Sequence, residues 1–145
     1  MHRHDREGGN ALVETAIALP ILLLMMVGIF EVGRAYETWQ VLTNAAREGA
    51  RASIVPSGDE ATTEALVRKY MTDGQLNAAA SASVVVDRNA VMVVNGTSMA
   101  ATQVTVDYPF NFIMLQPVAR LVVPGTNTGE DITMRATAMM RNEAP

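Results

Sequence analysis

The chain has 145 residues, enough for one domain, and a net charge of −4 with a pI of about 5.1. It carries no cluster of basic residues, which argues against a nucleic-acid partner, and no cysteine, which excludes disulfides, thiolate catalysis, iron–sulfur clusters and cysteine-ligated zinc. Its two histidines, His2 and His4, are interpreted as part of a basic leader rather than a metal site, because two imidazoles rarely complete a coordination shell.

Residues 11–30 form an apolar run of 20 positions in which Glu14 is the one charged residue. As a helix this run is about 30 Å long, the thickness of a bilayer core. A buried core helix seldom lacks a polar face over this length, and the run is too long for a cleaved secretory signal. We therefore predict a transmembrane helix over residues 10–33. A cytoplasmic leader over residues 1–9 precedes it, because more basic residues stand before the run than closely after it.

Glu14 is the most unusual residue of this run. An unpaired carboxylate in hydrocarbon costs roughly 2.5–3.5 kcal/mol, and Gly8 and Gly9 stand shortly before it in a stretch predicted to be open to proteases. The combination predicts a segment that is cleaved and then assembled, with the partner of Glu14 in another chain. Pro20 removes one helical hydrogen bond. It is either a tolerated transmembrane proline or a bend that shapes packing in an assembly.

Beyond the run, apolar residues recur at three- and four-residue spacing as far as Ile54. This predicts one helix of roughly forty residues, with a membrane anchor in its first half and the spine of a globular domain in its second. Glu31 and Arg34 are predicted to form an ion pair on its polar side. Tyr36 and Trp39 suit either the membrane–water interface or packing on the domain.

A second helix is predicted over residues 59–73. Ser57 and Glu60 form a capping signature at its start, and Gly74 closes it. Its expected buried stripe comprises Ala65, Leu66, Tyr70 and Met71.

Strand patterns follow over residues 83–87, 91–94, 102–108 and 131–140. Residues 88–90 are predicted as the turn of a hairpin, and Asn95-Gly96 marks another turn. Residues 34–145 are therefore expected to form an extracytoplasmic α+β domain. Its three- or four-stranded antiparallel sheet would pack on the second half of the long helix.

The apolar segment over residues 110–115 has two interpretations. It is an exposed patch for a partner or the membrane surface, or a loop or short helix that covers the core. We favour the second, because large apolar side chains are most often buried.

The sequence offers little for catalysis. Lys69 is the only lysine and is expected on a solvated helix face. Asp87, Asp107, Glu130 and Asp131 fall at turns and strand ends, where exposed carboxylates are routine. No glycine-rich phosphate loop is present. We therefore predict that the protein is not an enzyme and uses no cofactor.

Four stretches carry a family resemblance: residues 9–14 with the apolar run and Pro20 after them, residues 43–51, residues 104–110 and residues 134–143. Together they resemble the TadE-like family of the tight-adherence (Flp) pilus systems. The resemblance implies a pilin-like fold, in which a long N-terminal membrane-anchored helix packs against a small antiparallel sheet, with a second short helix.

The resemblance also implies processing. A prepilin peptidase in the membrane would cut after Gly9, so that the mature chain starts at Asn10 and Glu14 is its fifth residue. Mature members are pseudopilins, which assist assembly of the pilus rather than form its bulk. The implied partners are the peptidase, other pilins and pseudopilins, inner-membrane assembly proteins and membrane lipid.

Cleavage would create an α-ammonium at Asn10, which Glu14 of a neighbouring subunit could neutralise where water is scarce. Gly28 and Gly33 would let neighbouring spans approach closely. The alternative is a single-pass anchor that is never processed and carries a structural or binding domain of the cell envelope.

Overall fold

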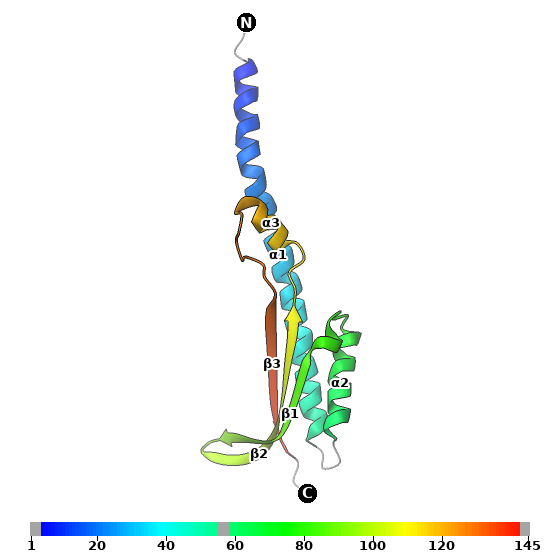
Figure 1. The fold of residues 1–145 in the computed structure, drawn as a ribbon. Helices are drawn as coiled ribbons and strands as arrows, with labels where there is room; N and C mark the ends of the chain where they lie inside the picture. The colour runs from blue at the N-terminus through cyan, green and yellow to red at the C-terminus, as the bar shows by residue number, and fades with distance from the viewer. Residues whose placement is uncertain (1–3, 55–58, 143–145) are drawn as a thin grey trace. The chain divides into compact units, whose positions relative to one another are not determined.

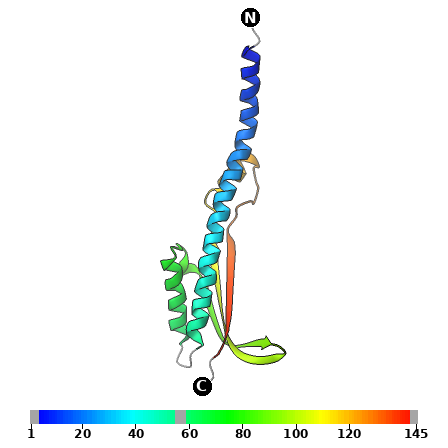
Figure 2. The same ribbon diagram turned by 180° about the vertical axis from the view of Figure 1, so that it is seen from behind.

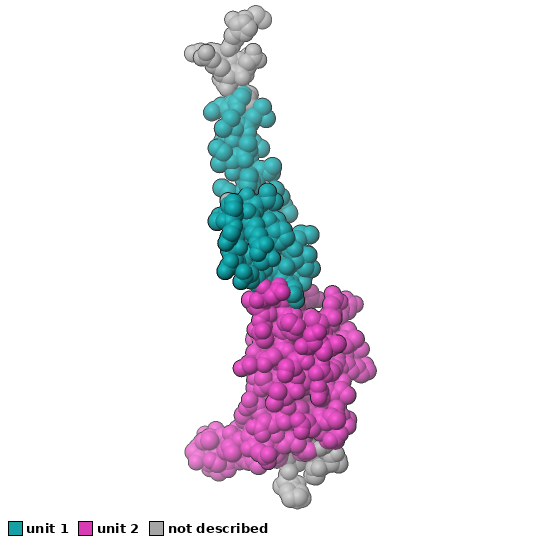
Figure 3. Space-filling model, in the orientation of Figure 1, with its two compact units in different colours: residues 1–34, 111–130 teal, residues 35–110, 131–145 magenta. Residues whose placement is uncertain are grey.

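The computed structural model describes residues 4–54 and 59–142 and has the predicted α+β composition (Figure 1). The elements are α1 (His4–Ser53), α2 (Glu60–Asp73), the 3-10 helix η1 (Ala79–Ser81), β1 (Ser83–Val94), β2 (Thr97–Phe110), α3 (Leu115–Val122) and β3 (Ile132–Arg141). The chain divides into two compact units, coloured separately in Figure 3. Unit 1 comprises residues 1–34 and 111–130, and unit 2 comprises residues 35–110 and 131–145. His2 lies outside the described residues.

Unit 2 contains the three-stranded antiparallel sheet, in the order β1-β2-β3. β2 is the central strand, and its alternating residues form the inner face of the sheet, as expected from their spacing. Val104, Val106, Tyr108 and Phe110 are all buried. The Tyr108 hydroxyl accepts a hydrogen bond from the backbone N–H of Ala78 at 3.2 Å, which satisfies the polar tip of this buried ring.

The predicted turn at residues 88–90 is wrong. β1 runs through it as a single strand with a register shift between Asp87 and Ala90, and Asp87 Oδ1 accepts a hydrogen bond from Asn89 N–H at 2.9 Å. The turn lies instead at Asn95-Gly96, where both residues have positive φ, 51° and 78°. A two-residue turn with positive φ at both positions matches the strand twist, and Asn-Gly adopts it at low cost. The bulge keeps β1 paired on both sides of Arg88.

The part of α1 in unit 2 packs beside α2 and on the sheet (Figures 1 and 2). Its buried stripe comprises Thr38, Leu42, Ala45, Ala46, Gly49, Ala50 and Ser53. Gly49 sets the closest approach, since a Cβ there would lie 2.5 Å from Val67 Cγ2 and 3.3 Å from Val104 Cγ1. Tyr36 and Trp39 remain largely exposed on the same helix.

The buried stripe predicted for α2 is mostly wrong. The helix buries Thr63, Val67 and Met71, whereas Ala65 and Tyr70 are exposed. The reason is tertiary: Val67 fits against the glycine surface of α1, and this contact sets the rotation of α2. The N-cap also differs from the prediction. Asp59 caps the helix by accepting a hydrogen bond from Thr62 N–H at 3.3 Å, and Ser57 lies outside the described residues.

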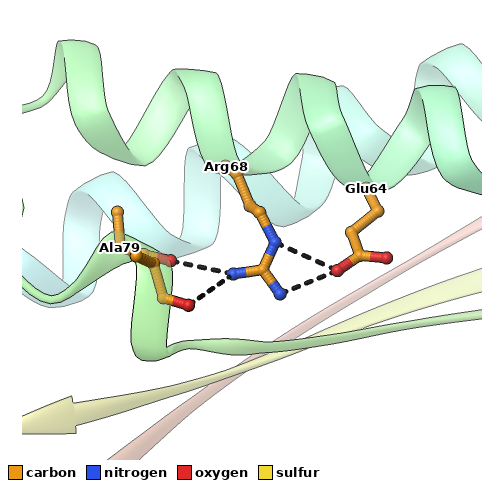
Figure 4. A network of polar contacts seen from close by, with 4 residues as sticks. Glu64, Arg68 and Ala79 are labelled. Carbon is orange, nitrogen blue, oxygen red and sulfur yellow. Dashed lines mark hydrogen bonds and ion pairs between the residues drawn. The ribbon is translucent and has the colours of Figure 1, made fainter.

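Arg68 joins α2 to the segment that leads into the sheet (Figure 4). Its guanidinium donates to Glu64 Oε1 at 3.0 Å and 2.7 Å and to the carbonyl oxygens of Ala79 and Ala80 at 3.0 Å and 3.2 Å. The planar fork of arginine makes these bonds simultaneously. The segment between α2 and β1, which contains η1, is therefore tied to α2.

Candidate functional site

The apolar run of α1 lies in unit 1 and is not covered by the other residues that the structure describes. Its 18-residue window of highest mean hydropathy, 2.3, is 0% buried. The large exposed side chains are Leu12, Val13, Ile17, Leu19, Ile21, Leu22, Leu23, Met25, Met26, Ile29 and Phe30. Among the described residues, α1 alone is long and apolar enough to cross a membrane. An apolar surface of this extent indicates a lipid or protein environment rather than water.

Glu14 projects from this apolar surface. Its side chain is exposed, and no hydrogen-bond or ion-pair partner for it lies among the residues that the structure describes. The hydroxyl of the next residue, Thr15, donates to the carbonyl oxygen of Ala11 at 2.8 Å, so this polar group is satisfied within the helix. A carboxylate on an apolar surface is costly where water is excluded, unless another group pairs with it.

The predicted processing residues Gly9 and Asn10 also lie in α1. Both are exposed, and no atom would lie within 4 Å of a Cβ placed on Gly9. Pro20 lies inside the same helix, which continues through it. Because proline has no N–H, the carbonyl of Ala16, four residues earlier, lacks its usual helical donor.

The two glycines predicted for assembly lie on different sides of α1. At about 100° per residue, Gly28 falls about 40° from Glu14 around the helix, whereas Gly33 falls about 100° from Glu14 and about 140° from Gly28. A Cβ placed on either glycine would have no atom within 4 Å. At Gly28 the missing side chain leaves a shallow apolar depression of about 410 Å³, lined also by Met25, Ile29 and Val32. The depression and Glu14 thus share one face of the helix.

Glu31 is a further functional candidate. Its predicted ion pair with Arg34 is confirmed, but Glu31 itself is buried and does not lie on a solvated face. Its side chain is 0% exposed. Oε1 accepts hydrogen bonds from the backbone N–H groups of Ile113 and Met114 at 2.8 Å and 2.6 Å, and Oε2 accepts one from Arg34 Nη1 at 2.5 Å. Met114 is the N-cap residue of α3 and makes no side-chain capping bond of its own. Glu31 therefore satisfies donors at the start of α3 from another helix.

One signal in the sequence could have located Glu31. It stands seven residues before Thr38 and fourteen before Ala45, which are both buried, so it lies on the inward stripe of the helix. Ion pairs at (i, i+3) spacing usually lie on the helix surface, so the pairing with Arg34 gave no indication that Glu31 is buried.

Residues 110–115 divide between the core and the surface. Phe110 is buried at the end of β2, as a core residue should be. Ile113 and Met114 lie on the surface just before α3, and Leu121 and Val123 continue that exposed apolar surface to the end of the helix. Among these, Leu121 is the most exposed, at 84%.

The residues considered for catalysis do not lie together at one site. Lys69 pairs with Asp73 on the exposed side of α2 at 2.5 Å. Asp107 on β2 accepts two hydrogen bonds from Arg135 on β3, and these hold the pKa of its carboxyl below the usual value despite partial burial. Asp87 on β1 is the register partner of Gln103 on β2, and Gln103 stands four residues before Asp107. No group of three or more potential metal ligands occurs among the described residues.

The family model described as TadE-like protein matches residues 9–51. A search of curated proteins found no match. A search of solved structures also found none. The matched segment begins at Gly9 and contains the exposed apolar run, Glu14 and the first buried turns of unit 2. Residues 9–51 of this chain are therefore similar to a segment of TadE-like proteins.

Proposed function

We propose that this protein is a prepilin-like pseudopilin that supports the assembly of a tight-adherence, type IV-like pilus. One observation carries the proposal: the TadE-like match starts at Gly9, the predicted cleavage residue, and covers an apolar helix whose carboxylate has no partner among the described residues. If this helix belonged to the core of its own chain, its apolar side chains would be buried. Exposure along the whole run instead suits a helix that lies in lipid and then among neighbouring helices.

The proposed topology follows from the same helix. Residues 1–9 form a cytoplasmic leader, residues 10–33 span the bacterial inner membrane, and residues 34–145 form the extracytoplasmic domain. The exposed aromatic rings of Tyr36 and Trp39 lie just after the span, where amphipathic aromatics are favoured at a membrane surface.

The proposed mechanism has two steps. A prepilin peptidase hydrolyses the Gly9–Asn10 peptide bond, which leaves a new α-ammonium on Asn10. Glu14 of one subunit then pairs with the α-ammonium of a neighbour, which removes a cost of roughly 2.5–3.5 kcal/mol for an unpaired carboxylate in the membrane. The depression at Gly28 lies on the face of Glu14 and offers a neighbouring helix a place for a side chain. Gly33 faces elsewhere and would serve a second neighbour.

One observation favours the alternative of an unprocessed anchor. α1 includes Gly9 and Asn10, so the bond to be cut lies in a helix, whereas proteolysis concentrates at exposed irregular segments. In that case the protein is a single-pass anchored structural or binding domain of the cell envelope.

Mass spectrometry of the protein from cells with and without an active prepilin peptidase separates the two functions. We expect a mature chain that starts at Asn10 only where the peptidase is active. A chain that keeps its leader in both strains would exclude the processing step and leave the unprocessed anchor.

The assembly step needs its own variant. We expect Glu14→Gln to be cleaved and inserted but to lose most of its co-purification with the other pilus components. Glu37→Gln, which changes an exposed carboxylate of the same helix beyond the apolar run, is the matched control and should co-purify normally. Equal recovery of both variants would show that Glu14 is not the assembly contact.

A further inference from the structure

α3 has an apolar outer surface that nothing in unit 1 covers. Ile113 is 59% exposed and Leu121 is 84% exposed, and Pro117 lies exposed between them at four-residue spacing. In the helix this spacing places Pro117 and Leu121 on one side, and Ile113 lies just before the first turn. Met114 and Val123 extend the same surface at its two ends.

The opposite side of α3 is held by the rest of unit 1. Ala119 is buried, and Leu115 and Val118 are half-buried. Gly129 has a φ of +83°, and a Cβ there would lie 2.6 Å from the backbone nitrogen of Gln116. The returning chain therefore passes in close contact with the first turn of α3. The helix is thus fixed on its inner side while its outer side stays apolar and bare.

Glu31 determines where along α1 this helix sits. Its carboxylate holds the N–H groups of Ile113 and Met114, and it directly follows Phe30, the last residue of the apolar run. Figures 1 and 2 both show α3 beside α1 at this level. The start of α3 is therefore tied to the point where the helix passes from apolar to mixed sequence.

We propose that α3 is an interfacial helix that lies on the bilayer surface at the C-terminal end of the span, with its outer apolar side among the lipid headgroups and upper acyl chains. This proposal rests on the membrane anchoring proposed above. The lipid is favoured as the occupant because Glu31 holds the start of α3 at the level of Ile29 and Val32, whose apolar side chains are exposed on other sides of α1. An amphipathic helix in this position buries its apolar side about 5–10 Å into the headgroup boundary.

Charge fits the same occupant. Arg120 is exposed near the C-terminal end of α3, next to Leu121. A cationic side chain beside an apolar stripe suits anionic lipid headgroups, because its long stem can lie on the apolar surface while its guanidinium reaches phosphate oxygens. The carboxylate of Glu31, which contacts the start of α3, is buried and directed at backbone donors instead.

The absence of cysteine from the sequence makes a direct test simple. Leu121→Cys introduces a single thiol on the outer side of α3, which can carry a nitroxide spin label. The labelled full-length protein is reconstituted into vesicles of phosphatidylethanolamine and phosphatidylglycerol. The accessibility of the label to oxygen, which concentrates in lipid, is compared with its accessibility to a water-soluble nickel complex. Ile17→Cys in the apolar run and Asn127→Cys in the exposed polar turn of unit 1 are the two references.

We expect the oxygen-to-nickel ratio at Leu121→Cys to approach that of Ile17→Cys and to exceed that of Asn127→Cys severalfold. A ratio like that of Asn127→Cys would place the surface in water and overturn the proposal. Low accessibility to both reagents would mean that protein, such as a second copy of this chain, covers the surface, which also overturns it. A high nickel accessibility at Ile17→Cys would instead contradict the membrane span and therefore the proposed function.

The role of Glu31 is tested on the same label. Glu31→Ala removes the acceptor for Ile113 and Met114, and we expect the oxygen-to-nickel ratio at Leu121→Cys to fall severalfold. Glu37→Ala, an exposed position of the same helix, should leave the ratio unchanged. An unchanged ratio in Glu31→Ala would show that other contacts hold α3 at the membrane.

Discussion

The two halves of α1 differ in what surrounds them, although one continuous helix contains both. Leu22 in the first half is 58% exposed, whereas Leu42 in the second half is 0% exposed. Gly28 has no atom within 4 Å of a Cβ position, whereas a Cβ on Gly49 would meet Val67 at 2.5 Å. In the second half, leucine and glycine therefore pack against other residues of the chain. In the first half, the same residue types stay exposed.

Apolar content alone therefore does not reveal a core. In the second half, small residues let α2 and the sheet approach, and the polar face of the helix is solvated. In the first half the helix is apolar all round, which suits a medium that is apolar on every side. Substitutions at matched positions should therefore change the stability of unit 2 in one half and association with lipid or partners in the other.

The largest contrast is expected between the two leucines. Leu42→Ala leaves a cavity in the core of unit 2 and should lower the free energy of unfolding by about 2–5 kcal/mol. Leu22→Ala removes a side chain that touches little within the chain and should leave this quantity nearly unchanged. Thermal unfolding of the full-length protein in detergent micelles, followed by circular dichroism, measures both. Equal losses for the two variants would contradict the division of α1 into a packed and an unpacked half.

The two glycines give a smaller contrast. Gly49→Ala should cost about 1–3 kcal/mol, because the new methyl group forces Val67 away from α1. Gly28→Ala meets no atom and gains the higher helix propensity of alanine, about 1 kcal/mol at most, so the melting temperature should hold or rise slightly. Gly28→Ala should nevertheless weaken co-purification with other pilus components, since it fills the depression on the face of Glu14. If Gly28→Ala co-purifies at the wild-type level, the depression is not part of the assembly contact.

The smallest effect is expected at a surface ion pair of unit 2, which tests whether that unit responds to pH. Asp107 and Arg135 are cross-strand partners, and the hydrogen bonds from Arg135 hold the pKa of Asp107 below its usual value. A lowered folded-state pKa contributes stability that is present above the unfolded pKa of aspartate, about 3.9, and is lost as pH falls through the folded pKa.

Asp107→Asn should therefore melt slightly below the wild type near neutral pH, and the difference should vanish in acid. The effect is small because Arg135 is largely exposed and water screens the pair. Arg135→Gln should lower the melting temperature by a similar amount, and the double variant by no more than either single one. A difference that grows as pH falls would mean that the pair does not act through this carboxylate.

Much of the fold could be predicted from the sequence where the local pattern is strong. The long helix, the turn at Asn95-Gly96, the inner face of β2 and the end of α2 at Gly74 all follow from periodicity or turn chemistry. The candidate site was predicted less completely. Asn10, Glu14 and Pro20 lie in the predicted helix, whereas Gly9 lies inside α1 and not in an open stretch before it. The roles of all four residues stay predictions.

The failures share a cause. The turn at residues 88–90, the stripe of α2 and the surface position of Glu31 were inferred from neighbours in sequence. Each was changed by a contact with a distant segment: β2 with β1, Gly49 with Val67, and Glu31 with Ile113. The C-terminal half of the family resemblance, residues 104–110 and 134–143, lies outside the matched segment and stays a prediction.

Composition and local spacing were enough to establish an apolar helix of membrane-spanning length with a single carboxylate, an α+β composition and the absence of cysteine. Which faces are covered was settled by contacts between distant segments. These contacts buried Glu31 beneath the start of α3 and left Leu121 bare. The Glu31 carboxylate accepts hydrogen bonds not only from Arg34 but also from two backbone N–H groups more than eighty positions away, and no local pattern contains that information.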